Sequence, residues 1–286
     1  MTFDAMHPCG VRSRVRQGMR TLQAAAIALT IGGSLTSPLF AAEQADPWPE
    51  LARDIFNGRD LKDGAGLIAI DMPYRAEDAA IVPVTLRATL PRGDARTVKT
   101  ITLVIDQNPA PVAATFRIGG GVTMISTRVR VDSYTNVHAV AELSDGGLYA
   151  STVFVKASGG CSAPTTKDAE EAKAGLGQMR FRQFAKPADG PISGPREAQI
   201  MIRHPNNSGL QRDQVTLLYV PAFFVRELRV WQGDELVLAM DGGISISEDP
   251  NIRFSYLPNG ATRFRVEAVD TDGHVFKGEW PVEAAM

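Results

Sequence analysis

The 286-residue sequence holds only two cysteines and four histidines, few aromatic residues (7%), and no excess of basic residues, with a formal net charge of −2. Two cysteines exclude the multi-disulfide framework of small secreted domains. Neither His138, His204 nor His274 has a second ligand at metal-binding spacing, so we expect no metal site. Residues 119–121 lack the spacing of a phosphate-binding loop, so we expect no nucleotide cofactor. Without a clustered basic face, nucleic acid is not an expected partner.

The N-terminus has the pattern of an export signal. Arg12, Arg14, Arg16 and Arg20 precede an apolar stretch over residues 22–35, and small residues near Ala42 suit cleavage there. An uncleaved anchor is the alternative, but the stretch is shorter than the ~20 apolar residues that span a bilayer. We therefore expect a periplasmic protein that is not in the membrane after cleavage.

Cleavage would leave Cys161 as the single cysteine of the mature chain, because Cys9 lies in the removed segment. The remaining chain would have five more acidic than basic residues. An unpaired cysteine in an exported protein indicates a reactive thiol or an intermolecular bond. A buried, inert cysteine in a glycine-rich turn is the alternative.

Cys161 follows two glycines directly after a strand-like run over residues 148–156. Glycine opens backbone conformations that other residues do not adopt. We therefore expect Gly159 and Gly160 to form a flexible motif that presents the sulfur outward, away from a rigid sheet.

The hydrophobic pattern predicts an all-β protein with a short N-terminal helix. The helix is expected over residues 48–56, where apolar residues recur on one face, and it should pack as a lid on the first domain. Strands of the first half are expected over residues 67–70, 82–90, 98–105, 112–118, 123–131, 137–143 and 148–155. Their spacing is typical of an antiparallel, immunoglobulin-like β-sandwich.

A connector is expected over residues 162–194, with a short helix over residues 167–177 and a Pro/Gly-punctuated end. A second sandwich follows. Its strands are expected over residues 198–203, 215–220, 223–231, 235–240, 252–257, 262–269 and 275–280. The expected organisation is therefore a signal peptide over 1–42 and sandwiches over 43–161 and 195–286, joined by a linker over 162–194.

Arg128 and Arg130 alternate with valines, so both should project from one face of their strand. We expect them to be solvated; pairing with the acidic linker around Asp168 is the alternative. A catalytic pair of Cys161 with a distant histidine stays open, since no sequence context selects one histidine.

Four segments of the first half carry a family resemblance. They are residues 104–111 with 114–116, residues 126–130, residues 140–146, and residues 155–161, which end in Gly159-Gly160-Cys161. In this order they resemble the SoxY family of periplasmic sulfur carriers, and the resemblance covers roughly residues 48–161.

The second half resembles SoxZ, the binding partner of SoxY. The matching segments are residues 202–205, Gly209 with residues 212–213, residues 221–228, and residues 270–273. The chain is therefore similar to a SoxY–SoxZ fusion of the kind associated with quinoprotein dehydrogenases, whose two halves pack together.

The resemblance implies a non-enzymatic carrier, with no catalytic residue, that holds a sulfur intermediate covalently on Cys161. It implies periplasmic redox enzymes as partners, either sulfur-oxidising or of the quinoprotein dehydrogenase and cytochrome type. Two features depart from the family's terminal GGCGG motif: the sequence continues as Ser162-Ala163-Pro164, and the motif is internal. A loop tethered at both ends reaches less far than a free tail.

Two rival hypotheses remain. One is an accessory module that docks a dehydrogenase or cytochrome without using its thiol. The other is a thiol enzyme that uses Cys161 with a histidine.

Overall fold

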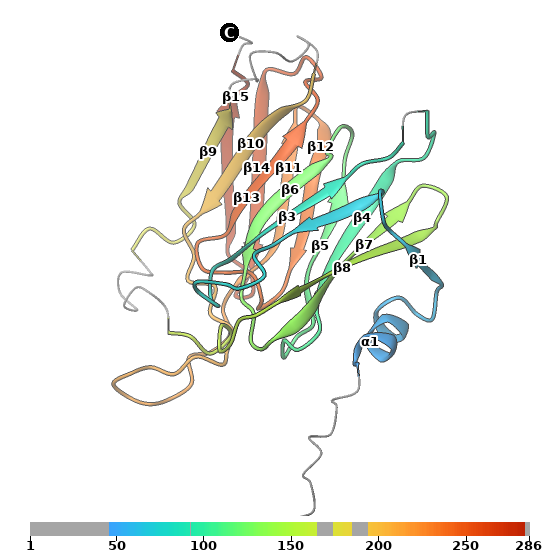
Figure 1. Ribbon diagram of the computed structural model, residues 1–286. Coiled ribbons are helices and arrows are strands. Elements are labelled where there is room, and N and C mark those ends of the chain that lie inside the picture. Colours follow the sequence, from blue (N-terminus) through green and yellow to red (C-terminus); the bar gives the residue numbers. More distant parts are fainter. Residues whose placement is uncertain (1–45, 92, 165–173, 185–193, 284–286) are drawn as a thin grey trace, which may run out of the picture. The chain divides into compact units, whose positions relative to one another are not determined.

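The computed structural model describes residues 46–91, 93–164, 174–184 and 194–283 (Figure 1). The predicted signal peptide over residues 1–42 lies outside the described residues. Within those four ranges, no helix is both long and apolar enough to cross a membrane.

The N-terminal helix is confirmed as α1 (Trp48–Ile55). The Asp46 carboxylate accepts the Trp48 backbone N–H at 3.1 Å, and Asn57 and Gly58 end the helix with positive φ angles. The buried face of α1 packs with Phe56 against β-strand residues such as Val140, so the helix covers the first half as expected.

Seven strands of the first half are confirmed to within a few residues. They are β2 (Ile68–Asp71), β3 (Val82–Ala88), β4 (Val98–Ile105), β5 (Val112–Ile118), β6 (Met124–Val129), β7 (Thr135–Leu143) and β8 (Leu148–Val155). A further short strand, β1 (Leu61–Asp63), was not predicted and pairs with β8 in parallel.

The second half contains β10 (Arg196–Ile202), β11 (Val225–Gln232), β12 (Glu235–Gly242), β13 (Asn251–Tyr256), β14 (Arg263–Asp270) and β15 (Val275–Pro281). The strand predicted over residues 215–220 is wrong. The Asp213 carboxylate accepts the backbone N–H groups of Val215 and Thr216, which closes a turn instead. Val215 is 91% exposed, so this apolar run has no buried face that would favour a strand.

The predicted linker contains a strand of its own, β9 (Met179–Phe184), which pairs with β10. The helix predicted over residues 167–177 lies mostly outside the described residues, and residues 174–177 form turns. Met179 and Phe181 pack against the main core, because alternate residues of this edge strand face inward.

Two sheets form the layers of the fold (Figure 1). One has the order β1-β8-β7-β4-β5-β12-β11-β14-β15, and the other β2-β3-β6-β13-β10-β9. Strand β5 pairs with β12, and β6 pairs with β13, so both sheets continue from the first half into the second. The all-β sandwich prediction is confirmed, and the two halves are joined edge to edge in each layer.

The core lies between the two sheets and spans both halves. Alternation along β3, where Val82, Val84 and Leu86 are buried and the intervening residues are not, shows how one face of each strand is directed inward. Phe116 from the first half and Phe254 from the second belong to the same buried cluster. The described residues from Asp46 onward accordingly cluster as one compact unit.

Candidate functional site

Cys161 lies in the turn that follows β8, within a segment (residues 157–164) that we call the arm. It is the free cysteine of the described part of the chain, and its side chain is fully buried, with 0% exposure. The expectation of an outward-facing thiol is therefore wrong for this conformation, and the contacts of the arm explain why.

The arm binds the backbone that follows β6. The Gly159 N–H donates to the Asp132 carbonyl at 2.7 Å, and the Gly160 N–H donates to the Val131 carbonyl at 3.1 Å. The Cys161 N–H donates to the Asp132 carboxylate at 3.2 Å. Three successive donors of the arm are thus satisfied, so the arm is docked and does not extend into solvent.

The second half of the chain holds the other side of the arm. The Ser208 hydroxyl donates to the Cys161 carbonyl at 2.5 Å, and the Gln211 side-chain amide donates to the Ala163 carbonyl at 3.1 Å. Gln211 also accepts the Ser208 backbone N–H at 2.9 Å. Ser208 and Gln211 together connect the arm to the second half, and we call this pair of side chains the latch.

Position 160 requires a glycine, because backbone atoms occupy the space where a Cβ would lie. A Cβ at this position would lie 2.0 Å from the Ala79 carbonyl oxygen and 2.6 Å from the Val131 carbonyl oxygen, both rigid backbone atoms. Gly159 adopts a φ of 76°, in the left-handed region that favours glycine. The two predicted glycines therefore allow close docking of the arm, in addition to any flexibility that they give.

Arg130 is buried beside the arm, with 1% exposure. The solvated position that the sequence predicted for it is wrong, because β6 ends at Val129 and the chain turns under the arm. Its guanidinium donates to the Gly160 carbonyl at 3.2 Å and the Asn206 carbonyl at 3.4 Å, while Nε is buried without a hydrogen-bond partner. Burial lowers the pKa of Arg130 below its ordinary value, and nearby carboxylates, Glu248 before Asp78, oppose that shift.

Asn108, from one of the family-like segments, holds the backbone on which the arm docks. Its side-chain amide donates to the Arg130 carbonyl and to the Ser245 hydroxyl, each at 2.8 Å. Its side-chain oxygen accepts the Asp132 N–H at 2.9 Å. One buried amide therefore positions both Arg130 and Asp132 and links them to the second half.

Burial raises the pKa of the Cys161 thiol to about 12. The Asp132 carboxylate adds to this rise, and the Arg130 guanidinium opposes it. Because the thiolate is the nucleophile of cysteine chemistry, the docked thiol is protonated and unreactive at neutral pH.

The histidines lie in other hydrogen-bonded groups. His138 contacts the Asp106 carboxylate at 3.0 Å and stacks on Trp48, and His274 contacts Asp270 at 2.8 Å. The charged groups that act on Cys161 are Asp132 and Arg130, so the geometry gives no support to a Cys–His catalytic pair. No group of His, Cys, Asp or Glu in the described ranges is arranged to hold a metal ion.

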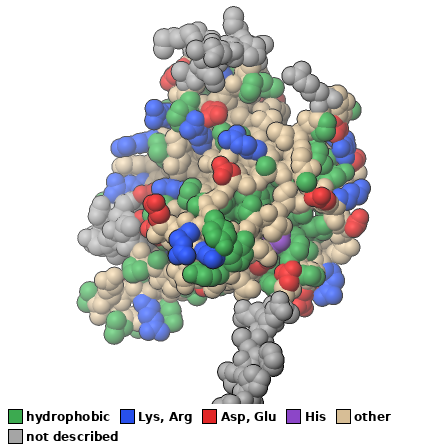
Figure 2. Space-filling model, viewed as in Figure 1, with side chains coloured by type: hydrophobic (Ala, Val, Ile, Leu, Met, Phe, Trp, Pro, Cys, Tyr) green, Lys and Arg blue, Asp and Glu red, His purple; other side chains and the backbone are tan. Residues whose placement is uncertain are grey.

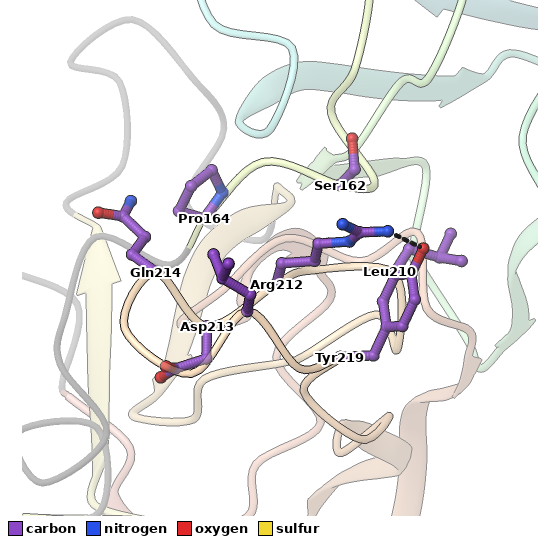
Figure 3. A pocket seen from close by; sticks show the side chains of 8 residues that line it. Ser162, Pro164, Leu210, Arg212, Asp213, Gln214 and Tyr219 are labelled. Carbon is purple, nitrogen blue, oxygen red and sulfur yellow. Dashed lines mark hydrogen bonds between the residues drawn. The ribbon is translucent and has the colours of Figure 1, made fainter. Parts of the chain in front are cut away.

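A hollow of about 460 Å³ lies beside the arm (Figure 3). Ser162 and Pro164 of the arm form one side, and Leu210, Arg212 and Tyr219 of the second half lie across from them. Arg212 donates to the Tyr219 hydroxyl at 3.0 Å. The arm therefore borders open space on the side of residues 162–164, while the thiol itself is covered.

Cys161 and its glycines stand out in the sequence, whereas the roles of Asp132, Ser208 and Gln211 and the buried position of Arg130 do not. Ser208 belongs to a segment that reads as an ordinary turn, residues 205–209, and Asp132 follows the end of a strand. The available signal was weak: a run of polar residues after the histidine at 204, in a half that otherwise alternates.

Comparison with known families gives two matches along the chain. The model of the family described as Sulfur oxidation protein SoxY matches residues 52–161, and that of Sulphur oxidation protein SoxZ matches residues 186–281. The first match ends at Cys161. No curated protein matches the chain.

Two solved structures resemble parts of the chain. The sulfur carrier protein SoxY from Chlorobium limicola f thiosulfatophilum is 23% identical, with 38% of this chain and 94% of that chain covered and a TM-score of 0.32. Superoxide reductase (neelaredoxin) from Ignicoccus hospitalis is 13% identical, with 32% of this chain and 78% of that chain covered and a TM-score of 0.28.

Proposed function

Because this chain belongs to the SoxY and SoxZ sulfur oxidation families as a fusion of the two, we propose that it is a periplasmic carrier that holds a sulfur-containing intermediate covalently on Cys161. SoxY and SoxZ proteins are carriers or accessory proteins and not enzymes, so the chain would present its cargo to separate enzymes. The periplasmic location rests on the predicted signal peptide over residues 1–42.

The single observation that carries this proposal is the position of the thiol. Cys161 is the last residue of the SoxY match, and it is held by side chains from both halves, Asp132 on one side and Ser208 on the other. A cysteine that served packing alone would need neither an arm of close-docked glycines nor a latch from the second half.

The docked position supports a resting state of the carrier. Release of the arm would expose the sulfur and return its pKa toward the ordinary value of about 8.5. Joining the released thiolate to an anionic sulfur compound through an S–S bond frees two electrons, which a redox partner must accept. Partners of the sulfur-oxidising or quinoprotein dehydrogenase and cytochrome type would meet that requirement, and the family resemblance favours them.

Arg130 supports an anionic cargo. A buried guanidinium whose bonds go to neutral carbonyls lacks full charge compensation. A persulfide or sulfonated adduct on Cys161 would place a negative charge near it when the arm docks again. We expect Arg130→Gln to shorten the lifetime of such an adduct more than Arg130→Lys, which keeps the charge; equal lifetimes in both variants would contradict this role.

The test is intact-mass analysis of the chain purified from its native periplasm. The expected result is an adduct that disappears after reduction and is absent from Cys161→Ser. Ser162→Cys combined with Cys161→Ser is the matched control, because it moves the thiol by one residue along the same arm. Unmodified protein under conditions that support sulfur oxidation would argue against a carrier.

The buried thiol favours a second candidate, an accessory module that docks a partner without using Cys161. The same Cys161→Ser variant separates the two functions. A module of this kind would retain full pathway activity in the variant, whereas a carrier would lose it.

A further inference from the structure

A second hollow lies on the outer face of the β2-β3-β6-β13-β10-β9 sheet, at the end where β10 and β9 meet the start of β13. Its volume is about 370 Å³, and its charged lining consists of three arginines, Arg128, Arg180 and Arg203, with a single carboxylate, Asp249. Figure 2 shows Lys and Arg side chains gathered on the left of the view, over β9 and β10.

Strand register brings these residues together from distant parts of the sequence. Met201 pairs with Arg180 on one side and with Asn251 on the other. Arg128 extends the same row, because the register of β6 with β13 places Arg253 opposite Ser126, two residues before it. Alternation in each strand then directs the four side chains of this row, Arg180, Met201, Asn251 and Arg128, to the outer face.

The site lies across the junction of the two halves. Arg128 belongs to the first half. Arg203 belongs to the second half, and Arg180 belongs to β9, the strand that pairs with β10 of that half. The site therefore exists only because β6 and β13 pair, and neither half could form it alone.

The electrostatics of the hollow are unbalanced. Arg128 donates through Nη2 to the Asp249 carbonyl, a neutral acceptor, at 2.9 Å, and its Nε is buried without a hydrogen-bond partner. Asp249 uses a carboxylate oxygen to accept the His204 backbone N–H at 3.1 Å, and both Asp249 and Arg203 interact further within the fold. Arg180 is exposed at the rim. The free capacity for an anion is thus on Arg128 and Arg180.

We propose that this hollow binds a small tetrahedral oxyanion of sulfur or phosphorus, such as sulfate, thiosulfate or phosphate. Guanidinium groups bind such oxyanions through paired N–H donors, and partial enclosure strengthens each charged hydrogen bond. Gln178 and Asn251 add side-chain amides to the lining. The site is separate from the arm and goes beyond the carrier function, since it needs no thiol.

The experiment is isothermal titration calorimetry on the exported full chain with sodium sulfate, thiosulfate or phosphate. Sodium chloride at equal ionic strength serves as the reference, because any added salt screens charges. Sulfate also stabilises proteins without binding to them, so the readout is the heat of binding and not protein stability. We expect saturable binding of at least one oxyanion, with an affinity that falls about tenfold in Arg180→Gln and in Arg128→Gln. Competition between the anions identifies the preferred source.

Arg182→Gln is the matched control, since Arg182 lies on the same face of β9, two residues further along, outside the hollow. It should leave the affinity unchanged. Arg180 is exposed, so its substitution leaves the fold intact even where Arg128→Gln does not. Heats that do not saturate, or equal affinities in the wild type and Arg180→Gln, would overturn the proposal. Cys161→Ser should bind the anion as the wild type does, which keeps this result independent of the carrier function.

Discussion

The Ser208 hydroxyl donates a 2.5 Å hydrogen bond to the Cys161 carbonyl oxygen, and through it the second half of the chain holds the thiol-bearing arm of the first. The bond is buried and connects residues 47 positions apart. In a fusion of a SoxY half with a SoxZ half, this contact gives the second half a defined role at Cys161: it keeps the thiol covered.

Removing this bond should expose the thiol. A hydrogen bond contributes about 1 kcal/mol, so Ser208→Ala should increase the population of the released arm about fivefold. The rate of Cys161 alkylation at pH 8 should rise by the same factor, because only the released thiol reacts.

Ser162→Ala is the control for Ser208→Ala. The Ser162 hydroxyl bonds the Gly159 carbonyl within the arm, at 3.3 Å and exposed to solvent, so its loss should leave the alkylation rate nearly unchanged. An equal rise in both variants would show that the second half does not hold the arm.

Gly160→Ala should prevent docking altogether. The added Cβ would lie 2.0 Å from the Ala79 carbonyl oxygen, which cannot move away cheaply. The expected result is alkylation at the rate of a fully exposed thiol, with circular dichroism unchanged. Gly159→Ala meets no atom closer than 3.9 Å and suffers only the strain of its positive φ, about 1 kcal/mol, so its effect should be smaller. The reverse order of the two rates would contradict docking by close approach.

Asp132→Asn should make the docked thiol more acidic. The substitution keeps an oxygen that accepts the Cys161 N–H but removes the charge that helps to raise the pKa of Cys161 to about 12. Ultraviolet absorbance of the thiolate follows the acidity of the docked thiol directly, without release of the arm. In the wild type the thiolate should keep forming above pH 9, where an ordinary thiol with a pKa near 8.5 is already largely ionised. In Asp132→Asn the whole titration profile should move to lower pH. An unchanged profile would show that burial alone sets the acidity.

The fold followed closely from the sequence because its strands carry local signals. The alternation in β4 and β5 and the turn residues after β7 set their bounds almost to the residue. Residues 215–220 carried the same apolar signal, yet Asp213 closes a turn there by accepting two backbone N–H groups. Hydrophobicity alone could not reveal that the fold offers no buried surface against which this segment packs.

The candidate site was only half predictable. Cys161 and its glycines stood out as local sequence features, but the burial of the thiol depends on contacts with Ser208 and Gln211, far along the chain. The position of Arg130 shows the same limit. Its alternation with Val129 predicted a solvated side chain, and only the docking of the arm over the strand end buries it.

The loop that carries Ser208 is anchored by a buried pair, His204 and Asp270. The two side chains are 3.5 Å apart and fully buried, and His204 accepts the Asn206 backbone N–H at 3.1 Å. Burial lowers the pKa of His204, with the Asp270 carboxylate opposing that shift. Burial also acts to raise the pKa of Asp270, but hydrogen bonds from His274 outweigh it and the pKa is lowered.

Acidification should therefore destabilise the fold in two separate steps. Below about pH 6.5 the unfolded chain binds a proton at His204, whereas the folded chain does not. The free energy of unfolding therefore decreases as the pH falls, by up to about 1.4 kcal/mol per pH unit. The stability from Asp270 is present above its unfolded pKa of about 3.9 and is lost only as the pH falls through its lower folded value.

Urea unfolding between pH 7 and 4 should show the first step in the wild type and a flatter profile in His204→Asn, which keeps an acceptor for the Asn206 N–H. His274→Gln should retain the first step, because it leaves the burial of His204, the largest cause of its lowered pKa, in place. Parallel profiles in the wild type and His204→Asn would exclude His204 as the source, and a parallel rise in Cys161 alkylation on acidification would link this loop to release of the arm.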